Sequence, residues 1–429
     1  MKSIKIEISE DLQGHEMIDP ESISDISTLH EKQTTWISSG HLKGYFSGGE
    51  FEGWVENGKL NESGILRSWD FEYWGDFKQN KAHGIGIYIS YLTKIIPDRI
   101  IPFKYYGEFE NGEINGYGAI LFLNGIQYFG EFKNSLFNGM GVLNNPDSRY
   151  YAGEFDANKL HGFGMMQLDE KYFYIGKFEF DDPKGCGIIS DGKSNYVVSD
   201  FNSPGNVKVL YADCEISTIE SIELCKQLAN KRWTASECFT HKRNNNKHIH
   251  SVKKNTAAFY NSIQFSNIIV AHNLNRNKIN TLINDEFFSG DLFVEDWYSD
   301  EIQDESHSFR EGVKVGEYSC GSYNGIALIK DRHYYDIGHF EKDCMFGTGI
   351  QIKDSDWYKL GFFENNELKN GLDFEDEVGY TFQLGIDSTL NTMRFSFNKS
   401  SPFEWISYFY EKETGEHLSK KNFNFREWM

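Results

Sequence analysis

The residue types best suited to binding a metal lie between positions 238 and 250. Cys238 and His241 are separated by two residues, and His248 and His250 follow shortly after. A structural zinc ion needs four such ligands in a tetrahedral arrangement. This spacing matches no familiar zinc-binding pattern and the surrounding segment is basic, so we expect solvated side chains here and no metal site in the chain.

Basic residues crowd the same part of the chain. Eight Lys and Arg residues stand from Lys226 to Lys254, against the single acid Glu237. Near an anionic membrane each such residue contributes about 1 kcal/mol of binding. Two interpretations stay open, a solvated loop that offsets the acidic remainder, or a contact with anionic lipid or an acidic protein surface. The candidate residues for such a contact are Lys231, Arg232, Lys242, Arg243, Lys247, Lys253 and Lys254.

Catalytic chemistry has no comparable candidate. The sequence holds no P-loop, no GxSxG elbow, no HExxH pair and no kinase signature. The net charge of −21 disfavours a surface for nucleic acid. The six cysteines are scattered without a CxxC pair, which is typical of reduced cysteines in a cytoplasmic protein. We therefore predict no enzyme, no cofactor and no nucleic-acid partner.

Repeats of about 23 residues organise the first half of the chain. Each is centred on what we call its anchor glycine, with an aromatic residue two positions before it, Phe two positions after it, and Gly-x-Gly beginning nine positions after it. Full copies have anchors at Gly75, Gly107, Gly130, Gly153 and Gly176, and a weaker copy is centred on Gly53. The last four full copies are 23 residues apart, whereas the gap of 32 before Gly107 indicates an insertion.

Each repeat predicts a β-hairpin. Side chains two residues apart on a strand share one face, so Tyr105 and Phe109 are expected on the same side. Asn111-Gly112 suits a tight turn with positive φ. The return strand carries Gly116 and Gly118, across which the rings of the neighbouring strand can lie.

The hairpin pattern resembles a known family. YYGEF…NGYG, YFGEF…NGMG and YAGEF…HGFG are similar to the MORN (membrane occupation and recognition nexus) repeat, and the resemblance covers Phe51–Ile188. It implies β-hairpin rods that act as scaffolds in cytoskeletal, ciliary and membrane-junction assemblies, and as accessory arrays on some enzymes.

Acids directly follow four of the anchor glycines. With two strands per repeat, successive members of this row are expected about 9.5 Å apart, at a strand spacing of about 4.8 Å. We expect the row to make its face of the sheet repel anionic membranes. Its members are Asp76, Glu108, Glu131 and Glu154.

A second, degenerate array is predicted near the C-terminus. Its anchors Gly316, Gly338 and Gly361 are 22 and 23 residues apart. The leading aromatic residue now stands three positions before the anchor, as Tyr335 and Tyr358, and not two. These segments are expected to form MORN-like hairpins whose faces the sequence does not assign, and the two arrays either dock on one another or bend at the segment between them.

The remaining segments supply covers and connections. Ile4, Ile6 and Ile8 alternate with charged residues and predict a strand that covers the open edge of the first array. Apolar residues that recur every three positions after Ser217 predict one amphipathic helix. Ser401-Pro402-Phe403-Glu404 has the pattern of a helix start and predicts a C-terminal helix.

Together these patterns predict an all-β protein, an elongated twisted sheet of two hairpin-repeat arrays with a short helical linker and a C-terminal helix. The predicted units are an N-terminal strand and irregular lead-in (1–50), a first array (51–199), a partly helical basic linker (200–285), a second array (286–395) and a C-terminal helix and tail (396–429).

The function predicted from this organisation is a non-enzymatic scaffold that binds structural or cytoskeletal partner proteins, in the cytoplasm, at the cytoskeleton or in a cilium. The alternatives are a peripheral membrane tether acting through residues 226–254 and a regulatory subunit of an enzyme. The candidate residues for protein binding are the aromatic residues on either side of the anchors, Tyr73, Phe77, Tyr105, Phe109, Tyr128, Phe132, Tyr151, Phe155, Tyr174 and Phe178.

Overall fold

The computed structural model describes the larger part of the chain. The described residues are 6, 14–16, 39–46, 49–68, 71–90, 103–122, 125–145, 147, 149–191, 195–198, 201, 207–211, 218–235, 269–270, 291–298, 311–319, 322–331, 334–353, 356–375, 379–385, 391–397, 404–411 and 417–424. They form two long sheets and one helix, α1 (Thr218–Ala229).

The first sheet contains 16 strands in sequence order, each antiparallel to the next. Its strands are β1 (Gly14–Glu16), β2 (Gly40–Phe46), β3 (Gly49–Glu56), β4 (Lys59–Ser68), β5 (Phe71–Lys78), β6 (Lys81–Ser90), β7 (Phe103–Glu110), β8 (Glu113–Phe122), β9 (Gln127–Lys133), β10 (Leu136–Asn144), β11 (Tyr150–Asp156), β12 (Lys159–Gln167), β13 (Phe173–Glu179), β14 (Asp182–Ser190), β15 (Asn195–Val198) and β16 (Val207–Tyr211). Each predicted repeat forms one hairpin of this sheet, for example β7 and β8.

The second sheet contains 12 strands, also in sequence order, of which β17 alone pairs in parallel, with β18. Its strands are β17 (Ile269–Val270), β18 (Asp291–Tyr298), β19 (Glu311–Ser319), β20 (Ser322–Asp331), β21 (Tyr334–Glu341), β22 (Cys344–Lys353), β23 (Trp357–Glu364), β24 (Glu367–Glu375), β25 (Gly379–Gly385), β26 (Asn391–Phe397), β27 (Glu404–Glu411) and β28 (His417–Asn424).

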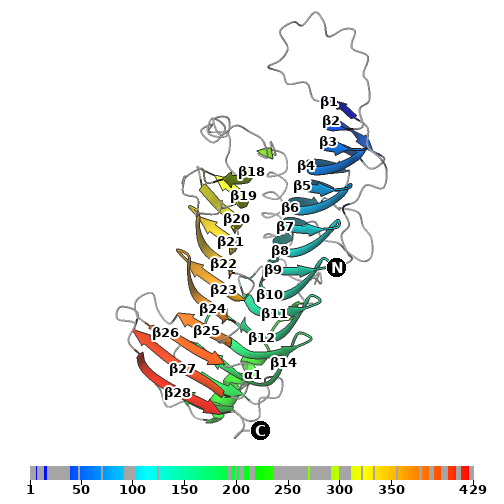
Figure 1. Ribbon diagram of the computed structural model, residues 1–429. Helices are drawn as coiled ribbons and strands as arrows, with labels where there is room; N and C mark the ends of the chain where they lie inside the picture. The colour runs from blue at the N-terminus through cyan, green and yellow to red at the C-terminus, as the bar shows by residue number, and fades with distance from the viewer. Residues whose placement is uncertain are drawn as a thin grey trace, which may run out of the picture.

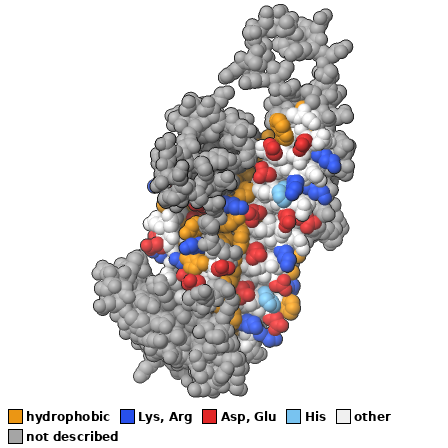
Figure 2. All heavy atoms as spheres, viewed as in Figure 1, with side chains coloured by type: hydrophobic (Ala, Val, Ile, Leu, Met, Phe, Trp, Pro, Cys, Tyr) orange, Lys and Arg blue, Asp and Glu red, His pale blue; other side chains and the backbone are white. Residues whose placement is uncertain are grey.

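The two sheets lie face to face and answer the open question of how the arrays are arranged (Figure 1). One hydrophobic core contains residues of both sheets, among them Trp74 and Phe129 from the first and Ile350 and Leu372 from the second. Hydrophobic side chains are visible along the line between the sheets in Figure 2. The protein is therefore a two-layered rod.

The first sheet also has a core of its own on the face turned away from the second sheet, which we call the far face. It is built from the repeated Tyr and Phe side chains, since residues on alternating positions reach opposite faces. On the second sheet the core of the outward face is a small cluster around Tyr323, Phe340 and Phe363.

Turns of successive hairpins are joined by a regular ladder of hydrogen bonds. The second residue of each turn bonds the preceding repeat twice. Its side chain accepts a hydrogen bond, as Asp181 Oδ1 does from Leu160 N at 2.8 Å. Its backbone N–H donates one, as Asp181 N does to Leu160 O at 3.0 Å. Asn158 and Asn366 make equivalent side-chain contacts. This ladder fixes how each hairpin stacks on the next.

At Gly112 the ladder keeps its backbone bond, from Gly112 N to Ala82 O at 2.8 Å, but it has no side-chain acceptor, and the backbone of Ile6 supplies one. Ile6 N donates to Gly112 O at 2.8 Å, and Ala82 N donates to Ile6 O at 3.1 Å. A Cβ on Gly112 would lie 2.9 Å from Ile6 O, so glycine is needed there. Ile6 thus fills a notch partway along the rod, and its predicted role as cover for the open edge is wrong because β1 is the edge strand. Ile4 and Ile8 lie outside the described residues.

Helix α1 confirms the helix predicted after Ser217, but the predicted C-terminal helix is wrong. Glu404, the last residue of the proposed helix start, begins β27, which pairs with β26 and β28. The segment Glu404–Glu411 is EWISYFYE, rich in the aromatic and β-branched residues that favour strands. Pairing on both sides therefore outweighs the local helix-start signal.

Candidate functional site

The repeated tyrosine lies against the two glycines that face it. A Cβ placed on Gly118 would come within 2.5 Å of the Tyr105 ring, and one on Gly107 would come within 2.6 Å of Gly118 Cα. The Tyr105 hydroxyl then donates to the backbone oxygen of Glu108 at 3.0 Å. The glycines therefore make room for a buried ring whose polar end is satisfied, and Tyr73, Tyr128 and Tyr151 repeat the arrangement.

Rings also connect each repeat to the next. Tyr105 meets Phe109 of its own repeat edge to face at 5.2 Å, and Phe132 of the following repeat at the same distance. Such edge-to-face pairs add about 0.5–1.5 kcal/mol beyond the burial of their area. Neighbouring repeats therefore bury one another's rings.

The acid after the anchor glycine satisfies a backbone group in the same hairpin. Glu108 Oε2 accepts from Tyr117 N at 2.9 Å, and Glu154 Oε1 accepts from Phe163 N at 2.8 Å. Gly116, with φ of 97°, carries no Cβ to meet the Glu108 carboxylate. The first position of Gly-x-Gly is thus a glycine because the acid lies against it, and the second is a glycine because the tyrosine ring does.

Two of the acids also hold the second sheet. Lys330 Nζ and the Tyr335 hydroxyl each donate to Glu108 Oε1 at 2.8 Å, and the Tyr380 hydroxyl donates to Glu154 Oε1 at 2.7 Å. Burial lowers the pKa of Lys330, but the Glu108 carboxylate outweighs it, so the net shift is upward. The expectation that this row repels membranes is therefore wrong for Glu108 and Glu154, which bind groups of the second sheet.

The displaced tyrosines of the second array lie on the face that meets the first sheet. Tyr335 stacks at a tilt on Tyr117 with ring centroids 4.9 Å apart, and the hydroxyls of Tyr117 and Tyr358 are 3.1 Å apart. Moving an aromatic residue by one position moves it to the opposite face of a strand. The departure from the repeat pattern thus places these rings at the sheet interface.

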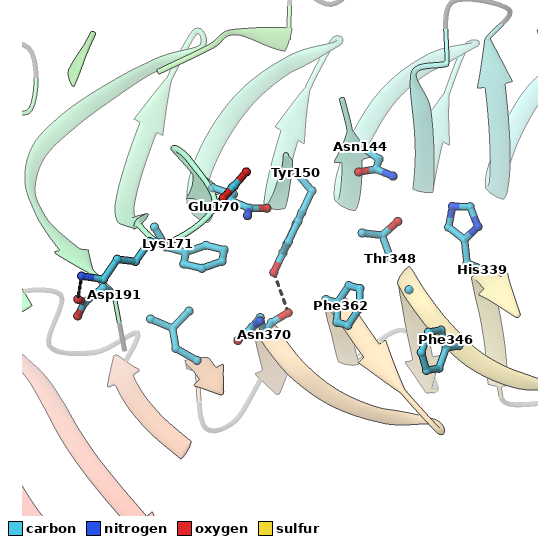
Figure 3. Close-up of a pocket in the computed structure, with 14 residues that line it drawn as sticks. Asn144, Tyr150, Glu170, Lys171, Asp191, His339, Phe346, Thr348, Phe362 and Asn370 are labelled. Carbon is cyan, nitrogen blue, oxygen red and sulfur yellow. Dashed lines mark hydrogen bonds and ion pairs between the residues drawn. The ribbon is translucent and has the colours of Figure 1, made fainter. Parts of the chain in front are cut away.

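A cleft of about 650 Å³ opens between the two sheets, where β10–β14 of the first face β21–β25 of the second (Figure 3). Tyr150 spans it, donating from its hydroxyl to Asn370 O at 3.0 Å. His339 lies at one end, where burial lowers the pKa of its imidazole to about 4. The cleft is lined by rings as well as polar and charged side chains.

Sequence reasoning missed this cleft, although departures from the repeat mark it. Thr348 stands ten positions after its anchor, where Ile85, Met140 and Ile326 stand in other repeats. Asn144 likewise takes the position that Leu121 occupies one repeat earlier. A comparison of repeats for polar residues at apolar positions would have found Thr348, whereas Gln167 takes the position of Asn144 one repeat later.

Family comparison agrees with this geometry. The MORN repeat family model matches residues 73–91, 105–126, 128–148 and 151–169. The chain contains MORN repeats. No curated protein matches the sequence. The hairpins anchored at Gly53 and Gly176 lie outside these matches, but they show the same glycine pairing, Gly53 with Gly64 and Gly176 with Gly187, so the same hairpin geometry extends in both directions.

The ten aromatic residues predicted to bind proteins lie inside the MORN array. The five tyrosines are fully buried in the far-face core, and the five phenylalanines are at most 4% exposed. Their prediction as a presented surface is therefore wrong for this structure, because each ring is already covered by neighbouring rings. The residues concerned are Tyr73, Phe77, Tyr105, Phe109, Tyr128, Phe132, Tyr151, Phe155, Tyr174 and Phe178.

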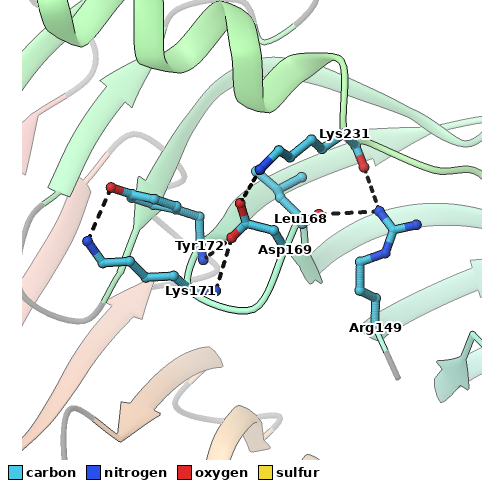
Figure 4. Close-up of polar contacts among 6 residues, drawn as sticks. All are labelled: Arg149, Leu168, Asp169, Lys171, Tyr172 and Lys231. Carbon is cyan, nitrogen blue, oxygen red and sulfur yellow. Dashed lines mark hydrogen bonds and ion pairs between the residues drawn. The ribbon is translucent and has the colours of Figure 1, made fainter. Parts of the chain in front are cut away.

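The start of the basic segment lies on the side of the MORN array (Figure 4). Lys231 Nζ pairs with Asp169 at 2.6 Å, and Arg232 pairs with Asp182 at 3.0 Å. Arg149 donates to the backbone oxygen of Lys231 at 2.8 Å. Lys231 and Arg232 thus contact acids of this chain. The other candidate residues, Lys242, Arg243, Lys247, Lys253 and Lys254, lie outside the described residues.

The remaining predicted chemistry has few described residues. Cys238, His241, His248 and His250 lie outside them. Within the described part of the chain, no group of three or more His, Cys, Asp or Glu side chains is placed to hold a metal ion. No helix in that part is both long and apolar enough to cross a membrane.

Proposed function

We propose that this protein is a non-enzymatic scaffold that joins partner proteins in a cytoskeletal or ciliary assembly. The observation that carries the proposal is the uninterrupted stacking of MORN hairpins into one sheet. Ring contacts and turn-to-turn hydrogen bonds tie each hairpin to the next, and the second sheet covers one face of the array.

Rigidity and length are the properties that such a scaffold needs. Sixteen strands spaced about 4.8 Å apart extend on the order of 70 Å along the stacking direction. Each repeat contacts mainly its neighbours, so the binding surface grows with the number of repeats. Because the repeated Tyr and Phe side chains are buried, we expect partners to bind the rims, the turns and the clefts of the rod.

The experiment is crosslinking in cells followed by mass spectrometry, after separation into detergent-soluble and detergent-resistant fractions. We expect the protein in the resistant fraction, with crosslinks from the lysines of 59–184 to one structural protein. Recovery in the soluble fraction, with crosslinks confined to residues 226–254, would favour a membrane tether. Crosslinks to a catalytic protein in constant stoichiometry would instead indicate a regulatory subunit.

A further inference from the structure

One repeat of the second array carries a polar side chain where the cleft opens between the sheets. Thr348 occupies the position at which the neighbouring hairpin β20 has Ile326. The Thr348 side chain points across the gap toward β10, where Asn144 lies (Figure 3). Thr348 is one heavy atom smaller than isoleucine and carries a hydroxyl, so it adds a polar group to the lining of the cleft.

Two of these polar atoms are buried without a hydrogen-bond partner. They are Thr348 Oγ1, on a residue only 7% exposed, and Asn144 Oδ1. The orientation of the Asn144 amide is set by its other end, since Nδ2 donates to Gln127 Oε1 at 2.9 Å. An unsatisfied buried group costs about 1–3 kcal/mol, so a ligand that donates hydrogen bonds here would relieve that cost.

His339 adds to the acceptor character of this end. Its Nε2 lies 2.7 Å from Gln127 Oε1, which already accepts from Asn144 and carries no hydrogen. Nε2 must therefore be the donor, and Nδ1 is left unprotonated in the neutral ring. The groups around Asn144 and Thr348 that can still form hydrogen bonds are thus acceptors and one hydroxyl, which suits a ligand with several donors.

Flat rings and carboxylates complete the lining. Phe173 and Phe362 line the cleft, and Phe346, which is 41% exposed, stands at its rim. At the other end lie the carboxylates of Glu170 and Asp191 and a single ammonium, that of Lys171, which pairs with Asp191 at 2.8 Å. The charged end therefore carries more negative than positive charge.

We propose that this cleft binds the guanidinium group of an arginine side chain carried by a partner protein. The guanidinium is planar, stacks on aromatic faces and presents five donors, which match the rings and acceptors of the cleft. A carboxylate ligand would face acceptors and acids, and a lysine ammonium would not use the flat rings as fully. The net charge of −21 also attracts a basic partner. This inference rests on the proposed scaffold function.

The test uses the full chain and a blocked amino acid, N-acetyl-L-arginine methylamide, followed by saturation-transfer difference NMR and titration. The citrulline and lysine analogues are the matched ligands, because citrulline keeps the shape and loses the charge. We expect arginine to bind about tenfold more tightly than citrulline, the effect of one hydrogen bond to a charged group. Equal binding of the two, or no arginine binding, would overturn the proposal without any variant.

Variants locate the site. Thr348→Val keeps the shape and removes the hydroxyl, and Asn144→Leu removes the acceptor; each is expected to weaken arginine binding about tenfold. Asn115→Leu is the control, since Asn115 is half-buried, lies away from the cleft lining and donates from its side chain to Glu110 in its own hairpin. Thermal melting checks that each variant folds. Unchanged arginine binding by both folded cleft variants would place the ligand elsewhere and refute the assignment.

The crosslinking experiment separates failure of this inference from failure of the scaffold. If partner crosslinks persist while arginine does not bind, the scaffold stands and the cleft assignment is wrong. If arginine binds in the cleft but no partner is crosslinked, the guanidinium site stands. The proposal that a scaffold partner supplies the arginine side chain is then refuted.

Discussion

In the first array the tyrosine stands two residues before the anchor glycine, whereas in the second array it stands three residues before it. Tyr128 therefore packs on the far face of its own sheet, while Tyr358 packs against the other sheet. The second array has charged residues where the first has tyrosines, for example Asp336 and Lys359. A shift of one residue has converted a self-contained aromatic core into a contact surface.

The difference shows how one repeat can serve two structural purposes. The first sheet has a substantial core on each face, and the second shares its main core with the first and keeps a small one of its own. The regular array is thus the stable platform, and the degenerate array is the layer that depends on it.

The largest expected effect comes from truncating a tyrosine in each array. Tyr128→Ala removes a fully buried ring stacked on Phe137 at 3.9 Å, and we expect it to lower the free energy of unfolding by about 4 kcal/mol. Tyr358→Ala, at the interface, is expected to cost about 2 kcal/mol. Urea denaturation measures both, and an equal or reversed order would break the distinction between platform and dependent layer.

Glycine substitution sharpens the comparison within the first array. The Cβ of Gly141→Ala would lie 2.5 Å from the Tyr128 hydroxyl, so the ring must move and we expect a loss of about 3 kcal/mol. Gly185→Ala is the control, because no atom lies within 4 Å and only its φ of 71° is unfavourable, at about 1 kcal/mol. Similar denaturation midpoints for the two variants would show that contact with the Tyr128 ring is not the reason for a glycine at position 141.

Acid should weaken the interface at His339. Burial lowers the pKa of this imidazole to about 4, below its unfolded value of about 6.5, so protonation favours the unfolded chain as pH falls from about 6.5 toward 4. We expect a loss of about 1–2 kcal/mol between pH 7 and pH 5. Glu131 and Asp336, whose pKa values burial raises, change stability in the opposite direction.

The His339→Gln variant separates these contributions, because the carboxylates remain in it. Urea denaturation at a series of pH values should show that wild type loses more stability on acidification than the variant does. Parallel curves for the two proteins would mean that His339 is not the group responsible.

The smallest effect is expected for the ion pair between the arrays. A double-mutant cycle with Glu108→Gln and Lys330→Met should give a coupling of about 1 kcal/mol, because both side chains are partly solvated. The same cycle at Lys184 and Glu179, an exposed pair within one hairpin, is the control and should give less. A coupling no larger than the control would show that Glu108 acts only on its own hairpin.

Much of the first sheet was predictable because its pattern is local and repeated. Tyr105, Gly118 and the Asn111-Gly112 turn follow from side-chain alternation and backbone preference, and the structure confirms them. The burial of Glu108 against Lys330 was not predictable, because it depends on a residue 222 positions away. The same holds for the C-terminal segment, where pairing with two neighbouring strands overrides a proline-marked helix start.

The cleft was hidden for a related reason. Thr348 and Asn144 each look unremarkable in their own hairpins, and only the docking of β22 near β10 brings them together. The sequence does contain part of the signal, since Thr348 is polar where Ile85, Met140 and Ile326 are apolar. Its meaning requires knowing which face of the second array is turned inward.

The ladder of turn contacts also divides the rod into two unequal flanks. Every hairpin turn from β3–β4 to β13–β14 has two residues. The connections between hairpins instead differ in length, from the short one at residues 69–70 to the long one at residues 91–102. A tag or domain inserted between β8 and β9 should therefore be tolerated, while one inserted at Asn134-Ser135 would break the bond from Ser135 N to Ile114 O. One flank has a fixed length, and the other is where this protein has room to acquire new sequence.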